Sequence, residues 1–267
     1  MAGSRTPVTG IIPKPLTVSG FAASIAIGTV PGWSAVAKFG RNTGIDTATD
    51  PEDVWTQGGL WVAPTTARLH DITGGAADDV GGTGMRTVRI FGLDSAWALQ
   101  QEDITLTGAV AVATASTYTR IFRMYGLTYG SGQTNGGAIL ATAQTDGTVT
   151  ASIAAGQGQT LMAIYAVPTG HTAFVCRLWA TANKATAAGA GDATLRLLVR
   201  GNLDTATPGW NVKRTVGLNI TGTSALEEDL CVPLSVTGPA DIRWEVEAVR
   251  SNNTDISAGF DLLLRTD

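Results

Sequence analysis

Short segments in which apolar and polar residues alternate are the feature that most constrains this chain. In "DIRWEVEAVR", one set of alternate positions contains the apolar residues Ile242, Trp244, Val246 and Ala248. The other set contains the polar residues Arg243, Glu245 and Glu247. Period-two alternation is the pattern of a strand with one face on a core and the other in water. Similar segments recur about every ten residues beyond residue 85, separated by Gly, Asn, Asp and Pro, which is typical of β-sandwiches and jelly rolls. We therefore expect an all-β chain built from sandwich or jelly-roll-like domains.

The glycine run "GGTGMRTVRIFGLD" at residues 81–94 resembles a phosphate-binding loop at first sight. Such a loop must follow a buried strand and open a helix, whose first amides hold the phosphate. Here Val88 and Ile90 alternate with polar neighbours, which predicts a strand, and Asp78 and Asp79 would repel a phosphate. We expect a turn, then a strand that pairs with "QQEDITLTG" across "SAWAL".

Helical signals are weak throughout the sequence. We expect no amphipathic helix longer than two turns, and one helical turn at most in each of "PEDVWTQ" and "TANKATAAGAG"; the second segment fits a loop better. The boundaries that follow are an extended N-terminal arm over residues 1–40, a β-rich domain over 41–155 and a fuller β-sandwich, jelly-roll-like, over 156–267. A single continuous sandwich is the alternative.

The expected arm is rich in proline, which opposes a long helix, yet it is too apolar for a free tail. An apolar extended segment needs a surface, because ordering it costs entropy that only burial offsets. We favour the surface of a neighbouring subunit, with an edge strand and loop of the same chain as the alternative. The candidate interface residues of the arm are Ile11, Ile12, Leu16, Phe21 and Trp33.

Composition bounds the partners. Hydrophobic residues make up 44% of the 267 residues and charged residues only 15%, whereas about a quarter is usual for a soluble domain. So few charges favour packing against other protein. The net charge of −4 gives no basic face for nucleic acid. Cys176 and Cys231 lie in apolar runs and are expected to be small buried residues. No segment has the length of a signal peptide core or a membrane span, which favours synthesis in a cytoplasm without a membrane partner.

Catalytic and metal-binding patterns are weak. His70 and His171 lack a nucleophile elbow and spaced partners, so both are expected in turns or on the surface. The acidic stretch "GIDTATDPEDVW" is the best calcium candidate, through Asp46, Asp50, Glu52 and Asp53, but a helix cap or turn explains it as well. A remote alternative is a polysaccharide-degrading enzyme with paired carboxylates drawn from Asp78, Asp79, Asp94 and Glu102. We assign no catalytic residue, cofactor or metal.

The seven tryptophans raise a carbohydrate-binding hypothesis, because an indole face can stack on a sugar ring. Trp179 and Trp244 lie on alternating strand faces and are expected in the core. Trp97 and Trp210 lie in turn-like contexts and are the candidates for exposed contacts. Packing in a core or an interface is the competing explanation for all of them.

Several phrases of the chain resemble an uncharacterised family of tailed-bacteriophage virion proteins: "VPGWSAVAKFGRNTGIDTATDPEDVWTQGG", "GGTGMRTVRIFGLD", "GQTLMAIYAVPTGHTAF" and "SNNTDISAGFDLLL". The resemblance extends from about residue 30 to the end. It implies membership of a virus particle and brings no catalytic residues.

Composition and resemblance together predict a structural protein of the virion, assembled in the host cytoplasm. Our first expectation is a head decoration or cement protein, a homotrimer, that binds the major capsid protein or other virion proteins and stabilises the assembled capsid. The alternative place is the tail, as an adaptor, baseplate or fibre component that contacts the host surface.

Overall fold

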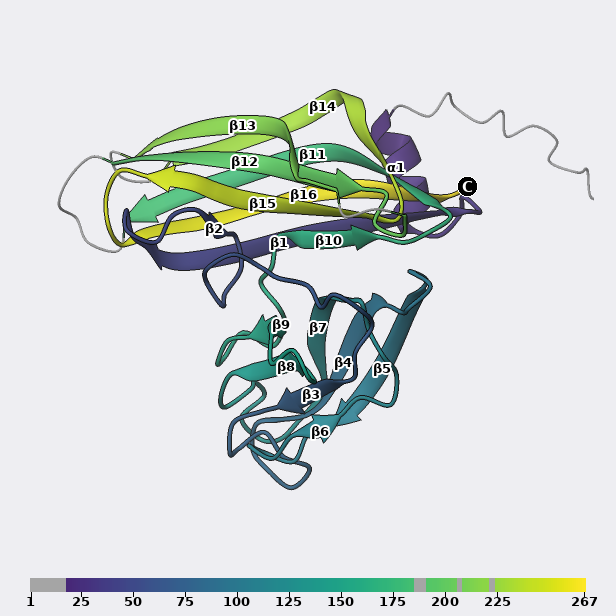
Figure 1. Ribbon diagram of the computed structural model, residues 1–267, viewed down its shortest axis with the longest axis vertical. Helices are drawn as coiled ribbons and strands as arrows, with labels where there is room; N and C mark the ends of the chain where they lie inside the picture. The colour runs from purple at the N-terminus through teal and green to yellow at the C-terminus, as the bar shows by residue number, and fades with distance from the viewer. Residues whose placement is uncertain (1–17, 185–190, 206–207, 221–223) are drawn as a thin grey trace, which may run out of the picture.

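The computed structural model describes residues 18–184, 191–205, 208–220 and 224–267, and it is nearly all antiparallel β, with 59% strand and 3% helix. The expectation of an all-β chain is confirmed. Figure 1 shows a larger upper unit and a smaller lower unit, joined by the segments beside β2 and β10. No helix within the described residues is long and apolar enough to cross a membrane.

The larger unit contains two sheets. Sheet 1 has the order β1-β16-β11-β14 and sheet 2 the order β10-β15-β12-β13, with the two-residue strand β2 beside β15. The bounds are β1 Trp33–Ile45, β2 Glu52–Asp53, β10 Ile164–Val167, β11 His171–Lys184, β12 Gly191–Gly201, β13 Asn211–Ile220, β14 Ser224–Thr237, β15 Ala240–Val249 and β16 Thr254–Thr266.

Apart from β2, the eight strands of this unit pair in nested order, the first with the last and so on toward the middle. The first pairs with the last, β1 with β16; β10 pairs with β15, β11 with β14, and β12 with β13, all antiparallel. Two further pairings, β11 with β16 and β12 with β15, complete each sheet. The four pairs are therefore nested, as in one long hairpin whose paired strands are shared between two sheets.

The smaller unit is an excursion of the chain between β1 and β10. Sheet 3 has the order β6-β3-β8-β9 and sheet 4 the order β5-β4-β7. The bounds are β3 His70–Thr73, β4 Met85–Leu93, β5 Leu99–Thr105, β6 Val112–Ala113, β7 Arg120–Tyr129, β8 Ile139–Ala143 and β9 Val149–Ile153. β4 pairs with β5 across the expected connection, so the predicted strand pair is confirmed.

Each unit has its own hydrophobic core. The larger core is formed by alternating residues of sheets 1 and 2, with Trp244 and Phe260 fully buried, and it also takes in Leu93 and Phe122 of the smaller unit. The smaller core gathers residues of sheets 3 and 4 around Tyr118 and Met124. Trp244 is therefore a core residue, as its parity predicted.

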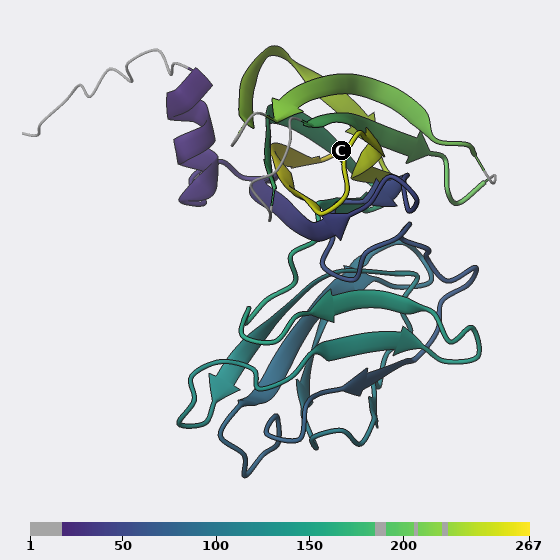
Figure 2. The same cartoon turned by 90° about the vertical axis from the view of Figure 1, so that its left-hand side faces the viewer.

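The N-terminal region differs from the expected extended arm. Residues Val18–Ala26 form the helix α1, because this alanine-containing stretch fits between Pro15 and Pro31, and Gly28 at φ 75° closes it in the left-handed conformation. Figure 2 shows α1 at one side of the larger unit. The expected boundary at residue 40 falls inside β1, which is an edge strand of sheet 1. The expected helical turn at "PEDVWTQ" is also wrong, since Glu52–Asp53 form β2.

The glycine-rich turn before β4 is organised around the carboxylate of Asp78, which is fully buried. Its Oδ1 accepts hydrogen bonds from the amides of Met85 and Gly136, each at 2.8 Å. Its Oδ2 accepts from Gly75 at 3.0 Å and Gly137 at 2.9 Å. A Cβ on Gly75 would lie 2.7 Å from the Cα of Gly137, so glycine is needed where these loops meet. The turn prediction is confirmed, and the loop's amides hold a carboxylate of the chain itself.

Replacing Asp78 by asparagine removes half of this arrangement. The amide offers one acceptor oxygen and sets its NH₂ group against two backbone donors, so we expect the free energy of unfolding to fall by about 2–3 kcal/mol. Urea denaturation at neutral pH measures it. Asp79→Asn is the matched control, because its Oδ1 accepts one bond, from Gly81, at an exposed turn. Equal effects of the two variants would contradict the assignment.

Candidate interaction surfaces

The described part of the N-terminal region is anchored on its own chain by three aromatic rings. The ring centroids of Phe21 and Trp33 lie 5.4 Å apart, and those of Trp33 and Phe174 lie 5.5 Å apart. α1 is thereby fixed beside the outer face of sheet 1. Phe21 and Trp33 thus contact the chain's own sheet, as the alternative of an edge strand in the same chain expects, and their contact with a neighbouring subunit stays a prediction. Ile11, Ile12 and Leu16 lie outside the described residues.

Trp97 and Trp210 are not the exposed platforms that their turn contexts indicated. Both are partly buried, and guanidinium groups lie over their rings. Arg120 lies 4.7 Å from the Trp97 centroid, while Arg200 and Arg243 lie 4.5 and 4.1 Å from that of Trp210. These cation–π contacts occupy ring surface that a sugar would need.

The arginines belong to a buried ion network between the two units. Asp241 of β15 is fully buried and bonds Arg120 of β7 at 3.0 Å and Arg200 of β12 at 2.8 Å. Further along β15, Arg243 bonds Asp53 and Glu245, each at 2.8 Å. The polar parity of β15 was expected to face water. Instead the smaller unit and the segment around β2 cover it, and the charges are paired with one another.

Two further charged groups mark this junction. Burial raises the pKa of the Asp53 carboxyl to about 7, against the opposing effects of the Arg243 guanidinium and the Trp61 amide. Lys38 of β1 is buried and donates from Nζ to the carbonyl of Phe122 in the smaller unit. Burial lowers the pKa of Lys38 well below its ordinary value. Nothing in the local sequence around Lys38 signals this contact, which joins positions 84 residues apart.

Asp241→Asn should weaken the junction between the two units and so lower the free energy of unfolding. The substitution leaves two arginines in a buried site without their carboxylate, so we expect a loss of about 3–5 kcal/mol in the free energy of unfolding. Chemical denaturation with fluorescence detection measures it. The control is Asp103→Asn, which breaks the exposed Arg89–Asp103 pair and should have the small effect typical of exposed ion pairs. A small effect of Asp241→Asn would show that the junction does not depend on this carboxylate.

The acids considered for catalysis hold turns and loops, and several of those considered for calcium connect segments far apart in the chain. Asp94 accepts from the amides of Ala96 and Ala98, and Glu102 from those of Ala115 and Ser116. Together with Asp78 and Asp79, they stabilise separate turns. Of the calcium candidates, Asp46 accepts from the Asn253 amide, Asp50 from Val249, Glu52 from Asn42 and Gly59, and Asp53 from Trp61 and Arg243. In the described ranges, no group of three or more His, Cys, Asp or Glu is placed to hold a metal ion.

The positions of one histidine and one cysteine differ from those expected. His70 is fully buried at the start of β3, with Nδ1 3.0 Å from the Arg68 carbonyl and its ring packed edge-on against Tyr118. Burial lowers the pKa of His70 to about 4. Cys231 is exposed and Cys176 is half-buried, and both are free. The expected surface histidine at 70 and the expected buried thiol at 231 are therefore both wrong.

The depressed pKa of His70 makes stability depend on pH. The imidazole of the unfolded chain is protonated below about pH 6.5, whereas His70 in the folded protein is protonated only below about pH 4. The free energy of unfolding therefore falls as the pH drops from about 6.5 to about 4. His70→Phe should reduce the loss between pH 7 and pH 5 by about 2 kcal/mol. Denaturation curves of both proteins at the two pH values test it. Parallel losses would contradict the assignment.

The most exposed strands of the larger unit are its two adjacent edges, β13 and β14 (Figure 1). On β13 residues 211–215 are all exposed, and on β14 alternate positions are exposed outside the bulge. Val212 on β13 and Val232 on β14 are 50% and 84% exposed. Opposite Cys176, the register of β14 jumps from Leu234 to Asp229. Residues 230–233 therefore form a bulge that carries Val232 outward. Apolar side chains on an unpaired edge are a surface at which another polypeptide can pair and pack.

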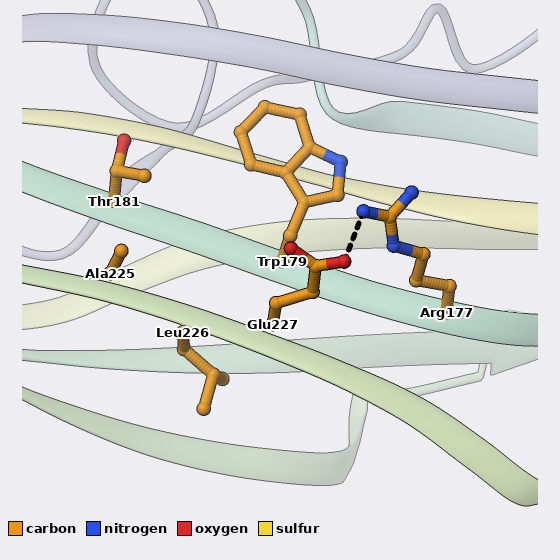
Figure 3. Close-up of a pocket in the computed structure, with 6 residues that line it drawn as sticks. All are labelled: Arg177, Trp179, Thr181, Ala225, Leu226 and Glu227. Carbon is orange, nitrogen blue, oxygen red and sulfur yellow. Dashed lines mark hydrogen bonds and ion pairs between the residues drawn. The ribbon is translucent and has the colours of Figure 1, made fainter.

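A second candidate surface is a pocket on the outer face of sheet 1 (Figure 3). It measures about 340 Å³ and is lined by Arg177, Trp179, Thr181, Ala225, Leu226 and Glu227. Figure 3 shows the Trp179 indole between Arg177 and Thr181, with Glu227 turned toward Arg177.

Trp179 was expected in the core, and its outward position has a local cause. The register of β11 shifts between Val175 and Arg177, so the inward parity changes from Ala173 and Val175 to Leu178 and Ala180. Strict alternation from Val175 would also have placed the charged Arg177 in the core. Arg177 was thus the available signal that the alternation breaks before Trp179.

The comparisons with known proteins add no family. No family model matches the chain, and no curated protein matches it.

Proposed function

We propose that this protein is a structural subunit of a tailed-phage particle and acts through protein–protein contact. The larger unit would be a jelly-roll sandwich. Pairing of the first strand with the eighth, the second with the seventh, the third with the sixth and the fourth with the fifth is the pairing of two Greek keys in a jelly roll. Viral capsid proteins and lectins both use this architecture, which supports the proposal together with the phrases that resemble virion proteins.

The single observation that carries the proposal is the exposed edge formed by β13 and β14. Proteins that stay monomeric usually blunt such edges with lysine, proline, bulges or short strands. This edge carries Lys213 on β13 and Pro233 in the bulge of β14. Yet β14 is fourteen residues long, and the same bulge presents Cys231 and the 84% exposed Val232 to solvent. A second subunit packed on this edge would cover these side chains, and a closed ring of three copies would cover the edge of every copy.

The first proposed place is the outside of the head, where the subunit would bind the major capsid protein. A subunit that binds the assembled shell, and not its dissociated parts, stabilises the shell by the free energy of binding. No catalytic residue enters this mechanism. The acids once considered for a cleft are needed for turns, which agrees with a contact function.

The second proposed place is the tail, in contact with the host surface. The observation that favours it is the outer-face pocket around Trp179, because a polar-rimmed aromatic pocket suits a small ligand better than a flat protein contact. Labelling particles with a gold-conjugated antibody against the protein separates the two places. Label over the faces of the head supports decoration, and label confined to the tail tip supports host contact. Absence from purified particles would overturn both.

Val232→Lys should prevent self-association. A lysine at the most exposed apolar position of the edge would have to be desolvated in the assembly, so we expect the trimer to dissociate to monomers at micromolar concentration. Size-exclusion chromatography with light scattering measures the mass. Val110→Lys, at a 69% exposed valine of the smaller unit, is the matched control and should remain trimeric. A trimeric Val232→Lys protein would place the interface elsewhere.

A further inference from the structure

We propose that the outer face of sheet 1 binds a saccharide, with the indole of Trp179 as the stacking surface. The strand register, one glycine and the charges at the rim of the pocket support this proposal, wherever the protein lies in a particle.

The register of sheet 1 places three rows of residues on this face. The central row runs across β14, β11, β16 and β1 as Glu227, Trp179, Gly259 and Phe39. One flanking row contains Asp229, Arg177, Asp261 and Ala37, and the other contains Ala225, Thr181, Ser257 and Arg41. An aromatic row is therefore bordered on both sides by hydrogen-bonding groups.

Gly259 makes the aromatic surface possible. A Cβ built on Gly259 would lie 2.6 Å from Cε2 and 2.7 Å from Cζ2 of Trp179. The indole therefore lies directly over the backbone of β16, in the space that any other side chain would fill. Because the backbone supports one side of the ring, the opposite side is turned away from the sheet.

The rim of the pocket is polar and open. The Arg177 guanidinium bonds the Glu227 carboxylate, and its Nη1 lies 3.5 Å from Oδ2 of Asp261. The side chain of Arg177 is 41% exposed, that of Glu227 65% and that of Asp261 39%. Carboxylates offer several acceptor positions, and a guanidinium offers five donors in a fixed plane. Thr181 adds a hydroxyl on the other side of the indole (Figure 3). Donors and acceptors thus surround an apolar floor.

This combination selects the chemical class of the ligand. A pyranose ring presents C–H groups on one face, which suit the negative face of an indole, and hydroxyls around its edge, which suit paired acids and arginine. A simple anion would have to compete with Glu227 and Asp261 for Arg177. A simple cation would meet Arg177 beside the ring. The pocket volume of about 340 Å³ lies within the range of small-molecule sites.

The test uses the full-length protein and three oligosaccharides: cellohexaose, chitohexaose and maltohexaose. Isothermal titration calorimetry should detect binding of at least one of them, and Trp179→Ala should weaken it by at least about tenfold. Glu227→Gln keeps an exposed side chain of the same shape and should weaken binding severalfold without affecting folding. In NMR spectra of the wild type, the Trp179 indole N–H signal, assigned with Trp179→Phe, should shift on titration.

The control variant is Trp97→Ala, which removes a tryptophan whose ring is covered by Arg120 and should leave saccharide binding unchanged. Absence of binding by the wild type to all three oligosaccharides would overturn the proposal. Binding that persists in Trp179→Ala, or shifts of other indole signals only, would overturn the site. Tighter binding of phosphate or tetramethylammonium than of any oligosaccharide would overturn the ligand class.

Discussion

The antiparallel pairing of β1 with β16 is the constraint on which the rest of the structure depends. It brings Trp33 opposite Arg265, near the two ends of the described chain, and so closes the larger unit. Everything between the two strands must then fold back on itself, which produces the inward sequence of pairings in sheets 1 and 2. The smaller unit is accommodated as an excursion after β1, and the chain returns to the larger unit at β10.

That excursion changes what the charged residues do. The smaller unit lies against the polar face of β15, where Asp241 and Arg243 are buried with their partners. A chain with few charged residues places several of them at this internal junction. Burying ions is costly unless each is paired with good geometry, so the junction favours one relative arrangement of the two units. The exposed edge at β13 and β14 and the pocket around Trp179 are on surfaces that the junction leaves open.

Carboxylates also hold several loops of the smaller unit, through hydrogen bonds from backbone amides. The glycine-rich turn has the amide-rich backbone of an anion site, and Asp78 occupies it from within the chain. Asp94 and Glu102 likewise hold turns through backbone amides. Acids that look available in the sequence are therefore used to fix the loops that connect short strands, where backbone donors have no strand partner.

The sequence by itself determined the class of the fold and the positions of most strands, because period-two alternation and turn residues are local signals. It also placed Trp244 in the core. Tertiary structure decided what parity cannot: the bulge that turns Trp179 outward, the second unit that buries Arg243, and the pairing of β1 with β16. It also placed Phe21 and Trp33 in contact with each other and with Phe174 of the chain's own sheet. The bulge has a local signal in Arg177. The other features depend on residues far apart in the chain, and a local pattern contains no information about the partner that covers it.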